Sequence, residues 1–199
     1  VYAEAALEAG WAAVIVDSHA ARGIGRLGAR LTVCTGLRLR GAQRAEDVFE
    51  ALEIVRADPR LDASRVVLTG WSHGGWTILD AMVMAEAGAR PDLSGVRSAL
   101  LLYPYCSLLT RADDAPIGGA FPVTMILAGR DRVVSAADCR DLAAERRAEG
   151  SDITIIEEPE LTHAFDAPDQ AADPRMRYDA EGAARALNRF RRTLIDAES

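Results

Sequence analysis

The sequence predicts an α/β fold in which helices cover both faces of a mainly parallel, doubly wound sheet. Two observations support this prediction. Short apolar runs typical of buried strands alternate along the chain with longer segments of helical periodicity. Most connections between them are short and carry the glycines and prolines that end such elements. Because no repeat or low-complexity tract interrupts the 199 residues, we expect one domain over residues 1–199.

Five apolar runs are predicted to be strands of this sheet. They are short, rich in valine, isoleucine and leucine, and several end at a turn-forming residue. The predicted strands cover residues 12–16, 66–69, 96–103, 123–128 and 153–156. The first of them ends at Asp17, and a long arginine- and glycine-rich connection follows over residues 18–41.

Five segments are predicted to be helices that lie between or beside these strands. Glycine follows three of them closely, as expected where a helix ends, and Asp58-Pro59 stops another. The predicted helices cover residues 2–9, 45–57, 73–87 and 136–149, and a last amphipathic helix contains Ala183, Leu187, Phe190 and Leu194 on one face. The segment 113–121 is predicted to be a loop.

The bulk composition restricts the partners that we expect. Hydrophobic residues make up 49% of the chain, and its net charge of −7 argues against a nucleic-acid partner. No apolar run approaches the roughly 18 residues of a membrane span, so we expect no membrane insertion.

The oligomeric state is open. A cytoplasmic location is the default expectation, with the periplasm or secretion as open alternatives.

Three cysteines, Cys34, Cys106 and Cys139, are widely spaced and do not have the spacing of metal ligands. We interpret them as buried or unreactive thiols. A Cys34–Cys106 disulfide is an alternative if the protein is exported. No cofactor or metal is predicted.

The pentapeptide Gly70-Trp71-Ser72-His73-Gly74 matches the pattern G-x-S-x-G of a nucleophile elbow. A predicted strand comes directly before it and a predicted helix directly after it. Such a turn strains the serine backbone, requires small neighbours, and lifts the hydroxyl clear of the sheet. It also places the backbone N–H of His73 at a helix N-terminus, where the N–H can donate to a developing oxyanion.

A serine hydroxyl needs a base within hydrogen-bond reach, and the base needs an acid that orients it. Ser72, Asp131 and His163 each follow a predicted strand, so a parallel sheet would bring them to one edge. Their order is the nucleophile-acid-base order of the α/β-hydrolases. Asp17 and Asp166 are the rival acids. Asp166 is too close to His163 in sequence to reach its far nitrogen easily, and Asp17 leaves a different strand.

Two further patterns fall in the connection over residues 18–41. The stretch from Gly23 to Gly28 matches the dinucleotide pattern G-x-G-x-x-G, but no helix is predicted to open at its third glycine, so we interpret it as a flexible loop. An arginine of this loop could clamp a substrate carboxylate; the candidates are Arg22, Arg26, Arg30, Arg38 and Arg40. Arg22 is preferred because it lies nearest the strand end, and Trp71 is the second residue that we expect to contact substrate.

The chain resembles the dienelactone hydrolase family of α/β-hydrolases, and the matching pieces span nearly its whole length. They are Ala9-Gly10-Trp11, Val14-Ile15-Val16-Asp17-Ser18, Ala21-Arg22-Gly23, Asp62-Ala63-Ser64-Arg65, Gly70-Trp71-Ser72-His73-Gly74-Gly75, Leu102-Tyr103-Pro104-Tyr105-Cys106, Gly129-Arg130-Asp131-Arg132-Val133 and His163-Ala164-Phe165. The resemblance implies Ser72 as nucleophile, Asp131 as acid and His163 as base. It also implies a substrate arginine, for which Arg22 is a loose match.

This chain departs from the family in two respects. It has serine where the founding enzymes use cysteine, which favours general ester or lactone hydrolysis. The early strands of the family, and the loop with the second oxyanion donor, would precede the first helix seen here. We therefore expect residues 1–199 to be the carboxyl-terminal part of a longer protein, with a missing strand between segments 12–16 and 66–69.

Three functions are compatible with these observations. The first is hydrolysis of a small-molecule carboxylic ester or lactone through an acyl-enzyme. The second is cleavage of an amide, because Gly-x-Ser-x-Gly-Gly also resembles the catalytic domain of the prolyl oligopeptidase group. The third is a non-catalytic hydrolase-fold protein that binds a ligand, against which the ordered Ser72, Asp131 and His163 argue.

Overall fold

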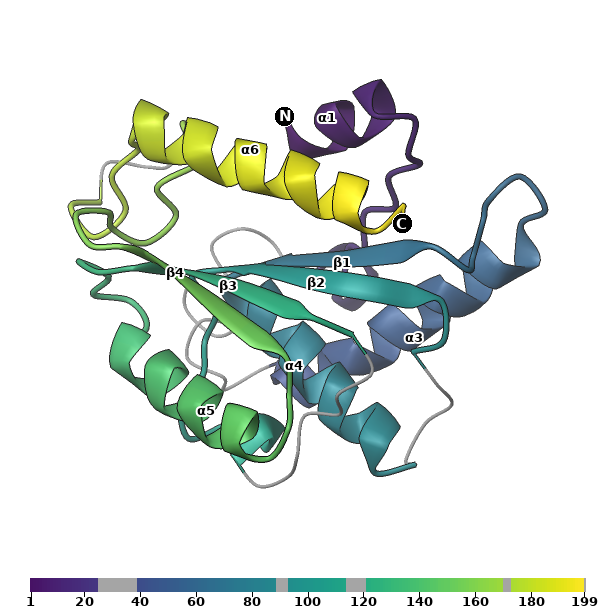
Figure 1. Cartoon of the computed structure of the whole chain (residues 1–199), viewed down its shortest axis with the longest axis horizontal. Coiled ribbons are helices and arrows are strands. Elements are labelled where there is room, and N and C mark those ends of the chain that lie inside the picture. The colour runs from purple at the N-terminus through teal and green to yellow at the C-terminus, as the bar shows by residue number, and fades with distance from the viewer. Residues whose placement is uncertain (25–38, 89–92, 114–120, 170–172, 199) are drawn as a thin grey trace.

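The structure is a computed structural model, and it describes residues 1–24, 39–88, 93–113, 121–169 and 173–198. Within these residues, four parallel strands form one sheet in the spatial order β1-β2-β3-β4 (Figure 1). The strands are β1 (Val66–Trp71), β2 (Val96–Leu102), β3 (Val123–Ala128) and β4 (Ile153–Glu158). Four of the five predicted strands are therefore confirmed, and the doubly wound α/β class is confirmed with them.

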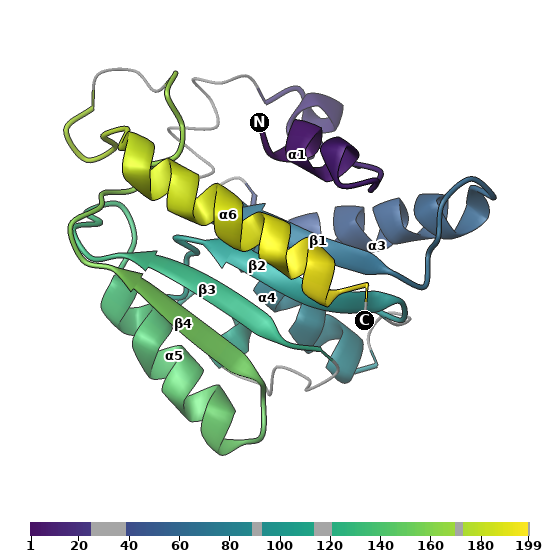
Figure 2. The same cartoon turned by 45° about the horizontal axis from the view of Figure 1, so that its top comes forward.

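Helices cover both faces of the sheet. The long helices are α3 (Gly41–Ala57), α4 (His73–Glu86), α5 (Ala136–Ala148) and α6 (Ala180–Asp196), and the short elements are α1 (Tyr2–Glu8), η1 (Ala20–Arg22) and η3 (Arg111–Asp113). Figures 1 and 2 show α6 and α1 on one face of the sheet and α3, α4 and α5 on the other. All five predicted helices are present. The early start of α3 at Gly41 is accompanied by a close tertiary fit, because a Cβ on Gly41 would lie 2.4 Å from the Trp76 ring.

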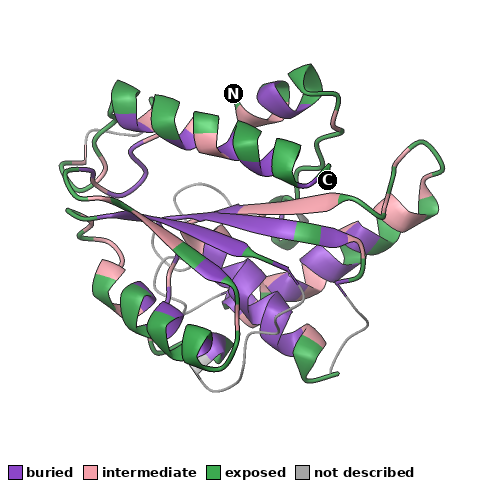
Figure 3. Cartoon of the chain, viewed as in Figure 1, coloured by how far each residue is buried: buried purple, intermediate pink, exposed green. Residues whose placement is uncertain are grey.

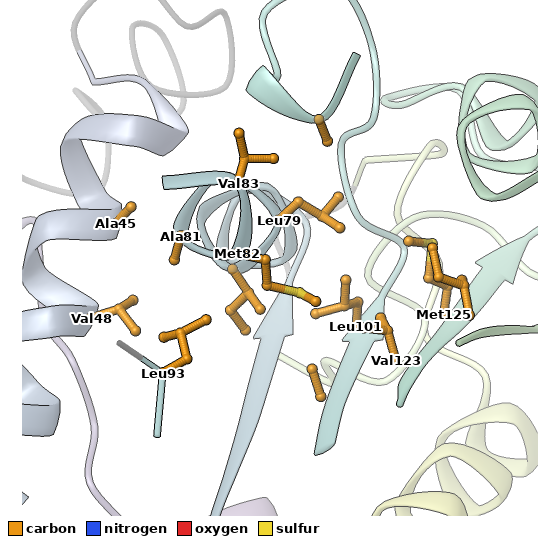
Figure 4. Packing of buried hydrophobic residues seen from close by; sticks show 14 of the residues in the cluster. Ala45, Val48, Leu79, Ala81, Met82, Val83, Leu93, Leu101, Val123 and Met125 are labelled. Carbon is orange, nitrogen blue, oxygen red and sulfur yellow. The ribbon is translucent and has the colours of Figure 1, made fainter. Parts of the chain in front are cut away.

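Alternation along the strands divides the core into two apolar clusters. In β2, Ala99 and Leu101 face the α3–α4–α5 side, whereas Leu100 and Leu102 face α1 and α6. Figure 3 shows β2 and β3 buried along most of their length and the outer sides of the helices exposed. Figure 4 shows how α4 fills the space between α3 and the sheet. This packing fixes the strand ends, from which the candidate site is built.

The prediction of a strand over residues 12–16 is wrong. These residues adopt no strand, they are exposed, and the Ile15 side chain is 80% exposed. A strand forms by pairing, and within the described residues β1 pairs only with β2. Residues 14–16 and β1 instead line a common cavity of about 740 Å³. Residues 12–16 and β1 are not paired with each other. That a missing strand lies between them, and that residues 1–199 belong to a longer protein, stay predictions.

A disulfide joins Cys106 to Cys139, which corrects the interpretation of the cysteines as free thiols. It connects the loop after β2 to α5 across 33 residues of sequence. Sequence spacing did not single out this pair, because the two cysteines approach only once β2 and α5 are packed. Cys34, the other half of the disulfide that we considered, lies outside the described residues.

Replacing both Cys106 and Cys139 with alanine should lower the free energy of unfolding by roughly 3–4 kcal/mol, the chain-entropy value for a loop of about this length. Urea unfolding without reductant would measure the loss. As an independent check, unfolded protein purified without reductant should titrate as one thiol, and as three after reduction. Three thiols before reduction would contradict the pairing.

Candidate active site

Ser72 lies in a sharp turn between β1 and α4, as the G-x-S-x-G pattern predicts. Its φ of 51° and ψ of −115° are strained for a residue with a Cβ. Helix α4 begins at the next residue, yet the Ser72 hydroxyl makes no capping bond to it. The hydroxyl is therefore available to a group outside the helix. The backbone N–H of His73 is one of the four that a helix leaves without an internal acceptor.

The glycines around Ser72 contribute to this turn unequally. A Cβ on Gly70 would lie 2.6 Å from the backbone of Gly74, and a Cβ on Gly75 would lie 2.6 Å from Cβ of Pro104. A Cβ on Gly74 would meet nothing within 4 Å. The turn thus requires glycine at Gly70, two residues before the serine. At Gly74, two residues after it, there is room for a methyl group.

Gly70→Ala should lower the free energy of unfolding by about 1–3 kcal/mol, because the new methyl group would clash with backbone atoms of Gly74 and Gly75, which cannot move away as a side chain can. Gly74→Ala is the matched control, and it should leave stability unchanged or raise it by up to about 1 kcal/mol, since alanine favours a helix over glycine. Urea unfolding of both variants would measure this. Equal losses would contradict the account of the turn.

The structure brings the three residues predicted for catalysis into one hydrogen-bonded line. His163 Nε2 lies 2.9 Å from Ser72 Oγ, and His163 Nδ1 lies 2.6 Å from Asp131 Oδ2. The side chains of His163 and Asp131 are 5% and 1% exposed. With Asp131 ionised, Nδ1 carries the proton and Nε2 is left as the acceptor for the serine O–H. Proton transfer from Ser72 to His163 is therefore geometrically available.

The turn after β3 holds the Asp131 carboxylate in place. Its Oδ1 accepts hydrogen bonds from the backbone N–H groups of Val133 at 2.8 Å and Val134 at 3.0 Å. The Arg130 N–H donates to the Leu161 carbonyl at 2.9 Å, which ties this turn to the loop that carries His163. Both carboxylate oxygens are thus engaged, one by the turn and the other by the imidazole.

A family model described as "Dienelactone hydrolase family" matches residues 2–197. The chain belongs to the dienelactone hydrolase family. A comparison with the curated proteins finds no match.

Solved structures of α/β-hydrolases share the fold of this dienelactone hydrolase family member. A candidate dienelactone hydrolase from Klebsiella pneumoniae is 21% identical, with a TM-score of 0.61 over 79% of this chain and 62% of that one. The dienelactone hydrolase-like promiscuous phosphotriesterase P91 from metagenomic libraries is 17% identical, with a TM-score of 0.64 over 92% and 82%. The esterase Est2 from Thermogutta terrifontis is 16% identical, with a TM-score of 0.60 over 81% and 68%. The chain thus spans less than two thirds of the Klebsiella protein.

The His73 side chain of this family member turns away from the serine. Its Nδ1 lies 2.9 Å from an Arg44 guanidinium nitrogen, and its Nε2 lies 2.9 Å from the Leu39 carbonyl oxygen. Because the guanidinium only donates and the carbonyl only accepts, Nδ1 is the acceptor and Nε2–H the donor, and the ring is neutral. Burial, together with the Arg44 charge, lowers the pKa of His73 to about 4. Burial also lowers the pKa of Arg44.

The two residues expected to contact substrate have defined places in the structure. Arg22 forms a bidentate ion pair with Asp47, with both N–O distances 2.8 Å, and also donates to the Ser18 carbonyl. Trp71 lines the cavity of about 740 Å³, as do Ser72 and His73. Their contact with substrate stays a prediction, as does the carboxylate clamp at Arg40. Residues 25–38, which include Arg26, Arg30 and Arg38 and most of the glycine-rich pattern, lie outside the described residues.

The rival acids are both engaged elsewhere. Asp17 accepts from the backbone N–H groups of His19 and Ala20 at 3.0 and 2.9 Å. Asp166 accepts from the side chains of Tyr2, Trp71 and Tyr103. Sequence reasoning missed Tyr103, whose ring lies against His163, although its position at the end of a predicted strand was a usable signal.

Two searches restricted to the described residues gave negative results. No group of three or more histidine, cysteine, aspartate or glutamate side chains there has an arrangement suited to a metal ion. No helix in that part of the chain combines the length and the apolar character needed to cross a bilayer.

Proposed function

We propose that this protein is a serine hydrolase that cleaves a carboxylic ester or lactone through an acyl-enzyme. One observation carries the proposal: the continuous hydrogen-bonded line from Ser72 Oγ through His163 to Asp131, with distances of 2.9 and 2.6 Å. A serine in a strained turn, a base at one side and an acid behind the base are the parts that nucleophilic catalysis requires. Membership of the dienelactone hydrolase family supports this assignment.

Each residue has a distinct role in the proposed reaction. His163 Nε2 takes the Ser72 proton while Oγ attacks the carbonyl carbon, and the carbonyl oxygen becomes an oxyanion. His163 then gives that proton to the departing alkoxide, which leaves the acyl group on Ser72. A water molecule that loses a proton to His163 attacks the acyl-enzyme, and the serine recovers its proton as the carboxylic acid leaves.

Asp131 and the His73 backbone N–H stabilise the charges that form during these steps. Asp131 keeps the proton of the neutral imidazole on Nδ1 and stabilises the imidazolium that forms when Nε2 is protonated. The His73 N–H, at the positive end of α4, donates to the oxyanion. Removing one such donor in other enzymes costs about 2.7–4 kcal/mol of transition-state stabilisation.

The proposed chemistry suits a small molecule that carries an ester or lactone carbonyl. Ser72 lines the cavity of about 740 Å³, but this cavity follows the edge of β1 at which we expect the missing strand, so its apolar wall is not taken as the substrate pocket. A lactone would give a ring-opened hydroxy acid, and a simple ester would give an acid and an alcohol.

Labelling with a fluorophosphonate probe and turnover of p-nitrophenyl acetate test the proposal. The protein should label at one serine and hydrolyse the ester, and Ser72→Ala should abolish both. Ser64→Ala, in an exposed turn, is the control that should change neither. Ester turnover that survives in Ser72→Ala would exclude the mechanism. Cleavage of an amide with no turnover of esters would favour the peptidase alternative, and failure of the wild type to label would favour a binding protein.

A further inference from the structure

The Asp166 carboxylate collects three side-chain hydrogen bonds from three separate parts of the chain. Its Oδ2 accepts from the Tyr2 hydroxyl at 2.8 Å and from the Trp71 indole N–H at 3.0 Å. Its Oδ1 accepts from the Tyr103 hydroxyl at 2.5 Å. The donors belong to α1, to the last residue of β1 and to the residue directly after β2. Asp166 itself lies on the loop after β4.

Two of these donors adjoin the residues proposed for catalysis. Trp71 directly precedes Ser72 in the strained turn. The Tyr103 ring packs edge-on against the His163 imidazole, with ring centroids 4.7 Å apart and planes inclined at 61°. Tyr103 is 3% exposed. Asp166, three residues after His163, thus forms hydrogen bonds with Trp71, which adjoins Ser72, and with Tyr103, which packs against His163.

The backbone at these positions needs external support to keep its conformation. Tyr103 and Ala164 have φ values of 38° and 51°, in the left-handed region that residues with a Cβ rarely occupy. Phe165 is fully buried, and its ring centroid lies 5.5 Å from that of Tyr103. The loop after His163 is therefore anchored both by the packing of Phe165 and by the hydrogen bonds of Asp166.

We propose that Asp166 is a positioning residue of the hydrolase: through Tyr103 and Trp71 it sets the imidazole of His163 against the hydroxyl of Ser72. The inference rests on the proposed function. Among the hydrogen bonds of the described residues, Asp166 makes none to the His163 imidazole or the Ser72 hydroxyl. Its effect therefore passes through Tyr103 and Trp71. A misplacement of about 1 Å in such a pair can cost on the order of a hundredfold in rate.

Substitution at Asp166 separates its hydrogen bonds from its bulk. Asp166→Ala leaves three donors without this acceptor, and the indole N–H has no alternative role because it only donates. Asp166→Asn keeps one acceptor oxygen, which can serve Tyr2 and Trp71, while its amide N–H₂ must then face the Tyr103 hydroxyl. That hydroxyl can accept instead of donate. The asparagine variant should therefore recover part of what alanine loses.

The test measures kcat and KM for p-nitrophenyl acetate together with the rate of fluorophosphonate labelling. Asp166→Ala should lower kcat and the labelling rate by about ten- to a hundredfold and leave KM within about twofold. Asp166→Asn should lie between alanine and wild type. Tyr103→Phe should lose part of the rate, and Tyr103→Phe combined with Asp166→Ala should be no slower than Asp166→Ala alone, since both act on one connection.

Asp179→Ala is the matched control for a general loss of stability. The Asp179 carboxylate caps α6 at the end of the same connection, accepting from the Gly182 N–H at 2.8 Å. Its loss should lower the melting temperature without lowering kcat. Unchanged kcat and labelling in Asp166→Ala, with an active wild type, would overturn the positioning role and leave the proposed function intact. An unreactive wild type would overturn both. If Asp166→Ala does not fold, Asp166→Asn and Tyr103→Phe decide by the same criteria.

Discussion

His163→Ala is expected to lower kcat/KM for p-nitrophenyl acetate by about 10⁵–10⁶-fold, the scale on which removing the base of a serine nucleophile acts in other hydrolases. The imidazole lies 2.9 Å from the hydroxyl. In the proposed mechanism it carries the proton in both half-reactions. Steady-state turnover and fluorophosphonate labelling should fall together. The combined variant Ser72→Ala, His163→Ala should be hardly slower than either single variant, since the two residues act as one unit.

Asp131→Asn is the more informative companion variant, because the structure dictates how the new amide would lie. Oδ1 of Asp131 accepts from two backbone N–H groups, of Val133 and Val134. The asparagine oxygen must take that place, so its N–H₂ faces His163 Nδ1 and turns this nitrogen into an acceptor. The proton then sits on Nε2, which can no longer take one from Ser72. We expect a loss of about 10⁴-fold, as for the wrong tautomer in other triads.

The control for this variant is Asp152→Asn, at an exposed position just before β4. It should leave kcat/KM within about twofold of wild type. Thermal unfolding of Asp131→Asn should show a folded protein, since its hydrogen bonds to the turn remain. Retention of more than a tenth of the wild-type activity by the folded variant would contradict the role given to Asp131.

Sequence reasoning found the candidate catalytic residues because each lies directly after a short apolar run that is recognisable as a strand. Ser72, Asp131 and His163 each follow a strand, and parallel strands in sequential order bring their carboxyl ends to one edge of the sheet. The apolar runs of β2 and β3 are buried on both faces and could be read directly from composition. The same reasoning failed at residues 12–16, because an apolar run forms a strand only where an adjacent strand provides backbone hydrogen-bond partners.

Contacts between distant side chains were beyond this reasoning. Tyr2 and Asp166 are 164 residues apart, and nothing in their local sequence marks them as partners. Cys106 and Cys139 approach only after α5 packs against the sheet, and Gly41 adjoins Trp76 only after α3 packs against α4. The residues that could react were predictable from strand order, whereas those that hold them depend on the packed structure.

The stability of this protein should fall with acid between about pH 6.5 and pH 4, and His73 should be a main cause. In the unfolded chain this imidazole binds a proton below its ordinary pKa of about 6.5. In the folded chain its burial and the Arg44 guanidinium lower the pKa to about 4. The unfolded state therefore binds more protons throughout this window, so the stabilisation is full above pH 6.5 and is lost as pH falls toward 4.

Integrated over that window, this one group accounts for roughly 2–3 kcal/mol, at a slope of up to about 1.4 kcal/mol per pH unit. His73→Asn is the matched test, because its side-chain oxygen can still accept from Arg44 but cannot titrate. Its unfolding free energy, measured in urea from pH 4 to pH 7.5, should be lower than that of wild type at neutral pH and depend less on pH. Burial lowers the pKa of the neighbouring His19 as well, so some slope should persist in the variant. Parallel curves for the two proteins would show that His73 is not the titrating group, because a constant offset reflects lost packing alone.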